Sequence, residues 1–208
     1  MKNLFIVFEG IDGSGTSTQA SLLKDYFIER GYRAVLSPEP SSGPIGKLIR
    51  EIMQKNIIVI NDDNKFDEQM AYLFAADRHY HLHNDVDGVF QLIHDKVNVI
   101  STRYYFSSLA YNCHNPEDFE FVSSLNRKFP NPDLVVYIDL PIEVSLMRLS
   151  DRFSRDVYEN KDKLVKVRKN FQSIFHHYDG LILKVDGTEL KDSIHQKIVS
   201  FLENNFAE

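Results

Sequence analysis

A glycine-rich segment near the start of the sequence has the residue types of a phosphate-binding loop. Residues 8–18 are FEGIDGSGTST. The loop pattern G-x-x-x-x-G-K-[ST] binds phosphate because its glycines let consecutive backbone N–H groups turn inward, while the final hydroxyl coordinates Mg²⁺. Gly10, Gly15 and Ser17 satisfy this pattern, but Thr16 occupies the position of the lysine. The segment predicts a phosphate site that lacks its usual side-chain cation.

The residues on either side of this loop predict the elements that hold it. The apolar run 4–8 before the loop is typical of a buried strand. After the loop, a helical face that stops at Gly31 is formed by Leu22, Leu23, Tyr26 and Phe27. A dinucleotide-binding fingerprint fails, because a G-x-G frame that starts at Gly13 reaches Thr18 at its last glycine position. The order of strand, loop and helix therefore favours a phosphate-binding loop and argues against a nicotinamide enzyme.

Short apolar runs rich in β-branched residues alternate with helical patterns along the rest of the chain. The runs lie at 34–36, 97–100, 134–138 and 181–185. The helical patterns are a face with Ile45, Ile49, Ile52 and Met53, a long stretch from about 66 to 94, and a C-terminal face with Leu190, Ile194, Ile198, Phe201 and Leu202. This alternation predicts an α/β fold with a parallel sheet, helices on both faces, and ligands beyond the carboxyl ends of the strands.

Length and composition predict one soluble domain that spans residues 1–208. The longest apolar runs are strand-sized, whereas a membrane span needs about 20 apolar residues. A strand that begins at residue 4 leaves no room for a secretion signal, so we expect a cytoplasmic protein with no membrane partner. Cys113 is the only cysteine, which excludes an internal disulfide and a cysteine zinc cluster. The net charge of −6 argues against a nucleic-acid partner.

Three further segments place polar residues near strand ends or on the following helix. They are Glu39-Pro40 followed by GPIG at 43–46, FAADR at 74–78, and RYYFSSLAY at 103–111. Together with the loop, these motifs resemble the thymidylate kinase family in order along the whole chain, and residues 148–159 with Val167-Arg168 look like the family's lid. The resemblance implies a P-loop nucleoside-monophosphate-kinase fold, with a five-stranded parallel sheet, helices on both faces and a short lid at about 148–160.

The resemblance also implies an activity. The chain would be a transferase that moves the γ-phosphoryl group of ATP to dTMP, with Mg²⁺, and gives dTDP and ADP for dTTP biosynthesis. Such a reaction needs two phosphate-bearing substrates in line and cations that neutralise the moving charge, so arginines and a metal site matter more than a covalent nucleophile. By the same resemblance we expect a homodimer, formed through helices of the long central stretch.

The donor side of the predicted site follows the glycine loop. By resemblance, the ATP-binding residues are Gly10, Asp12, Gly13, Ser14, Gly15, Thr16, Ser17 and Thr18. Ser17 is expected to hold the metal, and Glu9 to assist it through water. Arg103 is expected to grip the dTMP phosphate near the acceptor oxygen, and a lid arginine, Arg152 or Arg155, to act on the transferring group. For the lid arginines, a solvated basic face is the alternative interpretation.

The acceptor side draws on the other motifs. By resemblance, Phe74 stacks on thymine, Arg78 bonds its carbonyl edge, Ser107 helps to read the base, Tyr111 packs under the deoxyribose, and Asp12 accepts from the 3′-hydroxyl. The remaining predicted dTMP contacts are Glu39, Arg50 and Arg103. Without the motifs, Phe74 is a core residue, Arg78 is half of an ion pair with a nearby carboxylate, and Arg50 lies on a solvated helix face.

Two positions depart from the family pattern at the predicted catalytic centre. Thr16 replaces the loop lysine, and Thr102 stands where the family has an aspartate; Pro38 also stands where arginine is common. Loss of one preorganised donor typically costs about 2.7–4 kcal/mol of transition-state stabilisation. Three explanations are open: other groups (lid arginines, Glu9 or Glu39) take over, the enzyme is slow, or the chain is a regulatory protein that binds nucleotides without turnover. A kinase for another deoxynucleoside monophosphate is a further alternative, and active dTMP kinase is the first hypothesis.

Overall fold

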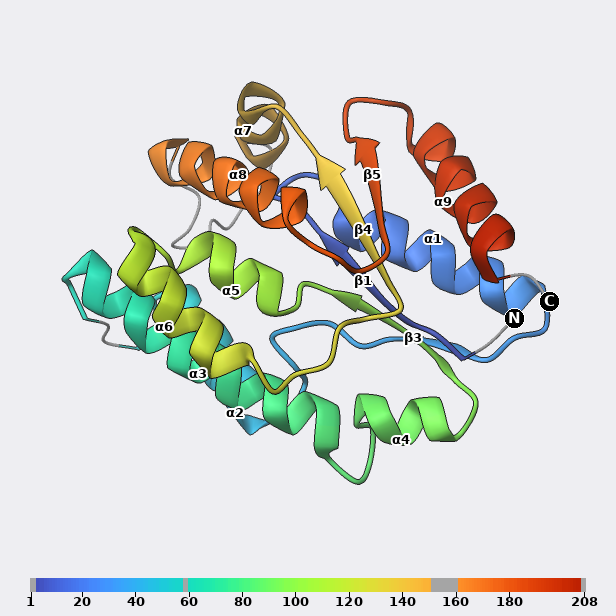
Figure 1. Ribbon diagram of the computed structural model, residues 1–208, viewed down its shortest axis with the longest axis horizontal. Helices are drawn as coiled ribbons and strands as arrows, with labels where there is room; N and C mark the ends of the chain where they lie inside the picture. Colours follow the sequence, from blue (N-terminus) through green and yellow to red (C-terminus); the bar gives the residue numbers. More distant parts are fainter. Residues whose placement is uncertain (1–2, 58–59, 151–160, 207–208) are drawn as a thin grey trace.

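The structure is a computed structural model that describes residues 3–57, 60–150 and 161–206. Its centre is a five-stranded sheet with the strand order β2-β3-β1-β4-β5, and every pair of neighbouring strands is parallel. Figure 1 labels β3, β1, β4 and β5 side by side in this sheet. The strands are β1 (Phe5–Glu9), β2 (Ala34–Leu36), β3 (Asn98–Thr102), β4 (Leu134–Asp139) and β5 (Ile182–Asp186). All of the predicted strands are therefore present, within one or two residues of their predicted bounds.

Helices cover both faces of this sheet. They are α1 (Thr16–Glu29), α2 (Pro44–Met53), α3 (Asp63–His83), α4 (Val89–His94), α5 (Tyr105–Tyr111), α6 (Pro116–Asn126), α7 (Ile142–Ser150), α8 (Lys161–His176) and α9 (Lys191–Phe206). Figure 1 shows α1 and α9 on one face of the sheet, and α5, α8 and the α2–α3 pair on the other. The predicted fold class, a parallel sheet between two helical layers, is confirmed.

The alternation of side chains along β1 explains why both faces are covered. Ile6 and Phe8 belong to the apolar cluster under α1 and α9, whereas Phe5 and Val7 belong to the cluster under α5 and α8. All four side chains are at most 4 % exposed. A strand that is apolar on both sides is typical of a sheet covered by helices on both faces. Because β1 is the central strand, the loop after it lies in the middle of the sheet's carboxyl edge.

The prediction of one long helix over 66–94 is wrong. α3 ends at His83 and α4 begins at Val89. Between them, the Asn84 side-chain oxygen accepts hydrogen bonds from the backbone N–H groups of Val86 and Asp87, at 3.1 and 2.9 Å. A side chain that bonds the backbone in this way replaces the helical hydrogen bonds and turns the chain.

The last helix differs from the prediction at its start. Leu190 was expected on the apolar face of the last helix, but it is 82 % exposed and precedes α9. Its predicted neighbours Ile194, Ile198 and Leu202 are buried, as expected. No helix within the described ranges is both long enough and apolar enough to cross a membrane.

Candidate active site

The glycine loop connects β1 to α1 at the carboxyl edge of the sheet. Gly13 and Gly15 have φ angles of 77° and 98°, in the region that side chains other than glycine rarely adopt. α1 begins at Thr16, and no side chain caps its first turn. The backbone N–H groups of that turn are therefore available to an anion, and the helix dipole favours negative charge there.

A cavity of about 180 Å³ lies over this loop, which we call the loop cavity. It is lined by Asp12, Gly13, Gly15, Thr16, Ser17, Thr18, Thr102 and Arg103. Most of the predicted ATP-binding residues are thus brought together, along with both threonines that depart from the family pattern. Gly10 and Ser14 do not line this cavity, and the Ser14 side chain is buried. The walls are mostly backbone and hydroxyl groups, with Asp12 and Arg103 as the charged side chains.

A second cavity, of about 270 Å³, lies on the other side of the same loop. Sequence reasoning missed its far wall, which comes from the turn between β5 and α9; the lining residues are Gly13, Ser14, Gly15, Thr18, Gln19, Arg148, Gly187, Glu189, Lys191 and Ile194. Arg148 donates hydrogen bonds to the carbonyl oxygens of Gly13 and Gly187, at 3.1 and 3.0 Å. This arginine fixes the loop to the β5–α9 turn.

Arg103 lies directly after β3 and joins the loop to a third cavity. Its Nη2 pairs with the Asp12 carboxylate, and its Nη1 donates to the Ser107 hydroxyl at 3.2 Å. The Tyr111 hydroxyl donates to the other Asp12 oxygen at 3.0 Å, so Asp12 is held from two sides. The backbone of Arg103 has a φ of 71°, which is uncommon for a side-chain-bearing residue and is often found at functional sites.

The third cavity, which we call the acceptor cavity, has a volume of about 270 Å³. Every residue predicted to bind dTMP lines it: Asp12, Glu39, Arg50, Phe74, Arg78, Arg103, Ser107 and Tyr111. These side chains come from the loops after β1, β2 and β3, and from helices α2, α3 and α5. The cavity shares Asp12 and Arg103 with the loop cavity, so two ligands bound in them would meet at these two side chains.

Arg78 is fully buried in the wall of the acceptor cavity and forms an ion pair with Glu39. Its Nε and Nη2 both donate to one Glu39 oxygen, at 3.0 and 2.7 Å. Nη2 also donates to the Ser108 hydroxyl, and Nη1 to the Asn126 side-chain oxygen. A buried guanidinium needs such partners because desolvation of an unpaired charge is costly. Arg78 is therefore both half of an ion pair and a lining residue of the acceptor cavity.

The loop after β2 is tied to α2 and α3 by charged groups. Arg50, on α2, donates to the carbonyl oxygens of Pro40 and Ser41 at 2.8 and 2.7 Å, so it is not simply on a solvated face. On α3, the buried Asp77 accepts from both the backbone N–H and the hydroxyl of Ser41, at 2.6 Å each. Sequence reasoning missed this use of Asp77, although it lies beside Arg78 in the FAADR segment.

Glu9 is brought to the site but not to the loop cavity. It is fully buried, and it accepts from the Tyr104 backbone N–H at 2.8 Å and from the Ser107 hydroxyl at 2.6 Å. Burial raises the pKa of its carboxyl from 4.5 to about 7. These contacts fix the start of α5, and the geometry gives no support to a role of Glu9 at the metal.

The two lid arginines cannot be placed. Arg152 and Arg155, and most of the predicted lid, lie outside the described residues. In the part of the chain that is described, no group of three or more histidine, cysteine or acidic side chains could hold a metal ion. A metal at this site would therefore depend on few protein ligands, as Mg²⁺ sites on nucleotide phosphates commonly do.

A parallel five-stranded sheet, a glycine loop after its central strand, and an acceptor cavity that shares an arginine with that loop define a P-loop nucleoside-monophosphate-kinase fold. Comparison with known proteins places it more closely. The family described as thymidylate kinase matches residues 8–198. The chain belongs to the thymidylate kinase family.

Individual relatives agree with this over nearly the whole chain. A protein from Methanococcus aeolicus described as a probable thymidylate kinase is 38% identical over 207 residues, which cover 96% of each chain. A protein of the same description from Thermococcus kodakarensis is 37% identical and covers 99% of this chain and 100% of its own. A third, from Methanocaldococcus jannaschii, is 35% identical over 97% of both chains.

Proposed function

We propose that this chain is a dTMP kinase, which transfers the γ-phosphoryl group of ATP to dTMP and gives dTDP and ADP for dTTP biosynthesis. The main support is the acceptor cavity, which contains every residue predicted for dTMP and opens beside the loop cavity. Asp12 and Arg103 line both cavities, at the point where the two substrates would meet. Family membership and the named relatives support the same activity.

The acceptor cavity suits a pyrimidine monophosphate in its chemistry. The half-buried Phe74 offers a flat apolar ring on which a base stacks, and Arg78 offers N–H donors to a carbonyl. At the other end of the cavity, Arg103 supplies the positive charge for the dTMP phosphate. Asp12 is placed to accept a hydrogen bond from the sugar hydroxyl, and Tyr111 packs beside it.

On the donor side, the phosphates of ATP would bind the backbone N–H groups of the glycine loop and the first turn of α1. The nucleoside would occupy the cavity between Arg148 and the β5–α9 turn. The loop cavity fits a divalent metal: its hydroxyl and carboxylate oxygens are the hard donors that Mg²⁺ prefers, with Ser17 as the protein ligand. Mg²⁺ bound there would neutralise phosphate charge.

The absence of the loop lysine leaves Arg103 and Arg148 as the arginines that contact the loop within the described ranges. Arg103 pairs with Asp12 and reaches the junction of the two cavities, so we assign it the main role in holding the transferring group. The prediction that Arg152 or Arg155 adds a further charge stays a prediction.

We also propose a homodimer that uses the outer surface of α3 and α6. Tyr72 and Phe119 are 51 % and 43 % exposed on these helices, and the Tyr72 ring lies 5.1 Å from that of Phe121. Figure 1 shows α3 and α6 side by side, away from the sheet. Phe121 itself is half-buried. Isolated apolar side chains are common on surfaces, but aromatic residues are enriched at interfaces. Sedimentation velocity should give a dimer for the native chain and a monomer for Tyr72→Asp.

The activity is tested by a coupled ADP-release assay with ATP, Mg²⁺ and each of dTMP, dUMP, dCMP and dGMP. Turnover that requires dTMP and is highest with dTMP is the expected result. Higher turnover with another monophosphate would change the acceptor. Binding of dTMP without turnover, even at high enzyme concentration, would contradict the kinase proposal and favour a regulatory nucleotide-binding protein.

A further inference from the structure

The Arg78 side chain is held in one orientation by the groups around it. Its Nε and Nη2 donate to Glu39, Nη2 also donates to Ser108, and Nη1 donates to Asn126. These bonds use most of the five N–H donors of a guanidinium, whose fork geometry is rigid. A guanidinium fixed in this way presents a defined edge to the acceptor cavity, so the group that fixes it affects what the cavity binds.

Glu39 is the principal partner of Arg78, but it lies on a loop and needs support of its own. That support comes from His81, whose Nδ1 lies 3.2 Å from the second Glu39 oxygen. The Nε2 of the same ring lies 2.7 Å from the hydroxyl of Ser37. Each Glu39 oxygen thus has a separate partner, and a polar chain runs from Ser37 through His81 and Glu39 to Arg78.

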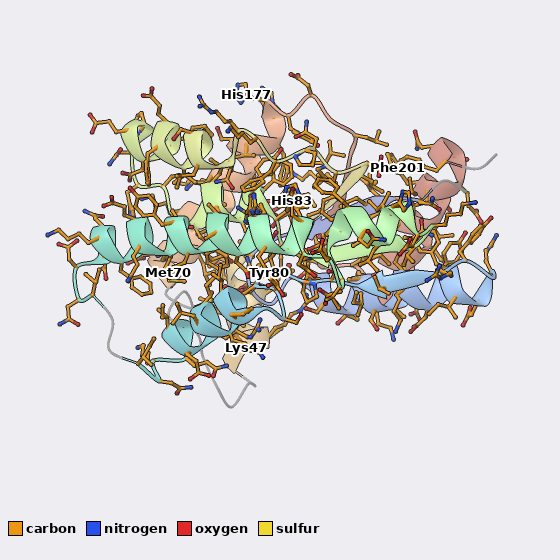
Figure 2. The ribbon with its side chains drawn as sticks, turned by 90° about the horizontal axis from the view of Figure 1, so that it is seen from below. Lys47, Met70, Tyr80, His83, His177 and Phe201 are labelled. Carbon is orange, nitrogen blue, oxygen red and sulfur yellow. The ribbon has the colours of Figure 1, made fainter. Side chains whose placement is uncertain are left out.

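The position of His81 follows from the helix. Arg78 and His81 are three residues apart on α3, so both point to the same side, toward the loop after β2. Both are buried, with exposed fractions of 1 % and 3 %. Figure 2 shows this part of α3 beside α2, where the neighbouring Tyr80 is labelled. The ring lies between Ser37 and Glu39 and contacts both of them.

The charged groups around Glu39 are consistent with this arrangement. Arg78 and His81 face its two oxygens, and the buried Glu9 carboxylate is close enough to interact with it electrostatically. With two carboxylates near one guanidinium, Glu39 could turn toward solvent in the cavity or toward Arg78. The bond from His81 holds it on the Arg78 side.

We propose that His81 is a positioning residue for base recognition: through Glu39 it orients Arg78, which reads the carbonyl edge of a pyrimidine. This inference rests on the proposed function, because it assigns His81 to the same acceptor cavity. His81 itself does not line that cavity, so it acts through Glu39 and not by contact with the substrate.

The test uses three variants of the full chain and measures binding, which does not depend on turnover. His81→Phe keeps a ring in the buried space but removes both nitrogen atoms. His81→Asn restores an N–H close to the position of Nδ1. Ser37→Ala leaves His81 in place and removes the partner of Nε2. His176→Phe, at an exposed histidine near the end of α8, is the matched control.

Calorimetric titrations with dTMP and dCMP give the expected results. His81→Phe should weaken dTMP binding by about tenfold, the range for loss of one charge-assisted hydrogen bond. The ratio of dTMP to dCMP affinity should fall with it, because cytosine has an amino group where thymine has the carbonyl. His81→Asn should recover most of the affinity, Ser37→Ala should lose about two- to threefold, and His176→Phe should match the native chain.

Kinetics and melting separate a positioning role from a structural one. In His81→Phe, KM for dTMP should rise while KM for ATP and kcat at saturating dTMP change by less than about twofold. A lower melting temperature with an unchanged dTMP to dCMP ratio, in both His81→Phe and Ser37→Ala, would overturn the inference. If the native chain binds no dTMP, the proposed function fails and this inference with it; if the native chain binds dTMP and His81→Phe binds it equally, this inference alone fails.

Discussion

The acceptor cavity and the loop cavity lie side by side, but different chemistry builds them. Charged side chains in the wall of the acceptor cavity are held by specific partners: Arg78 pairs with Glu39, and Arg50 donates to loop carbonyl groups. The loop cavity is formed mainly by backbone and hydroxyl groups. Thr16 and Thr102, the two departures from the family pattern at the predicted catalytic centre, line the loop cavity, whereas every predicted dTMP residue lines the acceptor cavity.

This difference has a physical reason. Recognition of a base requires particular donors and a flat ring at fixed places, so replacement of one buried partner leaves another unpaired. A phosphate cradle depends on backbone N–H groups, whose direction is set by glycines and by the start of a helix. The cradle therefore persists when Thr16 replaces a lysine, although a charge is lost. We call the acceptor cavity and its lining residues the acceptor half of the site, and the loop cavity with its lining residues the donor half. The comparison predicts that the acceptor half is complete and that the donor half is functional but weakened.

The largest effect is expected at Arg103, because both halves share it. Arg103→Met should lower kcat/KM for dTMP on the order of 10³-fold, since it removes the cation at the junction of the two cavities. Steady-state kinetics of Arg103→Met checks this. The control is Arg30→Met, at an exposed arginine that pairs with Glu203. A loss of less than about tenfold would mean that another group holds the transferring phosphate.

The next largest effect concerns the donor half alone. Thr16→Lys should raise kcat by about 10²-fold, because it restores a donor to the developing charge. KM for dTMP should stay the same. Thr16→Met, which has similar length and no charge, is the control for the size of the side chain. If Thr16→Lys is no faster than the native chain, the loop is already neutralised by other cations and the donor half is not weakened.

The third prediction concerns the buried carboxyl of Glu9 and whether it acts at the metal in the donor half. Its pKa rises from 4.5 to about 7 on burial, so the folded state favours the protonated form. The contribution of the protonated Glu9 carboxyl to the free energy of unfolding is fully present below about pH 4.5. It is lost as the pH rises through about 7, a change of about 3 kcal/mol. In urea unfolding, the free energy of unfolding of Glu9→Gln relative to that of the native chain should therefore increase by about this amount between pH 4 and 8.

Magnesium ion provides the control for this prediction. If Glu9 only fixes the start of α5, the difference in stability between the native chain and Glu9→Gln should have the same pH dependence with and without Mg²⁺. A pH dependence that moves to lower pH when Mg²⁺ is added would mean that the ion favours the charged carboxylate, and it would assign Glu9 to the donor half.

The smallest effect is expected from the backbone of the loop. Gly15→Ala places a side chain at a φ of 98°, which costs about 1–2 kcal/mol of stability. Gly31, just after α1, has a φ of 81°, and a Cβ added there would meet open space, as it would at Gly15. Gly31→Ala should therefore lose similar stability, but only Gly15→Ala should raise KM for ATP, by about tenfold. Equal KM values for ATP in both variants would contradict a backbone cradle.

The sequence predicts the sheet, the glycine loop and the membership of the acceptor cavity well, because each depends on local patterns. The apolar runs mark the strands, and the motifs name residues that line one cavity, such as Phe74 and Arg103. The break between α3 and α4 was missed, since it depends on one asparagine side chain that bonds the backbone next to it.

The partners of buried charges could not be predicted from the sequence. Arg78 was named as a donor to a base or as half of an ion pair, and the structure shows that Glu39, from a loop 39 residues earlier, is its partner. The contacts of Glu9 with Ser107 and of His81 with Glu39 also join residues far apart in sequence, separated by 98 and 42 positions. Such pairs depend on the packing of whole elements, and no local spacing indicates them.

The most direct test of the comparison is the equilibrium binding of dTMP in the absence of ATP. If the acceptor half is complete and independent, the native chain should bind dTMP more tightly than dCMP, and Thr16→Lys and Gly15→Ala should bind it with the native affinity. Failure of the native chain to bind dTMP without ATP, or weaker dTMP binding in either loop variant, would contradict the account.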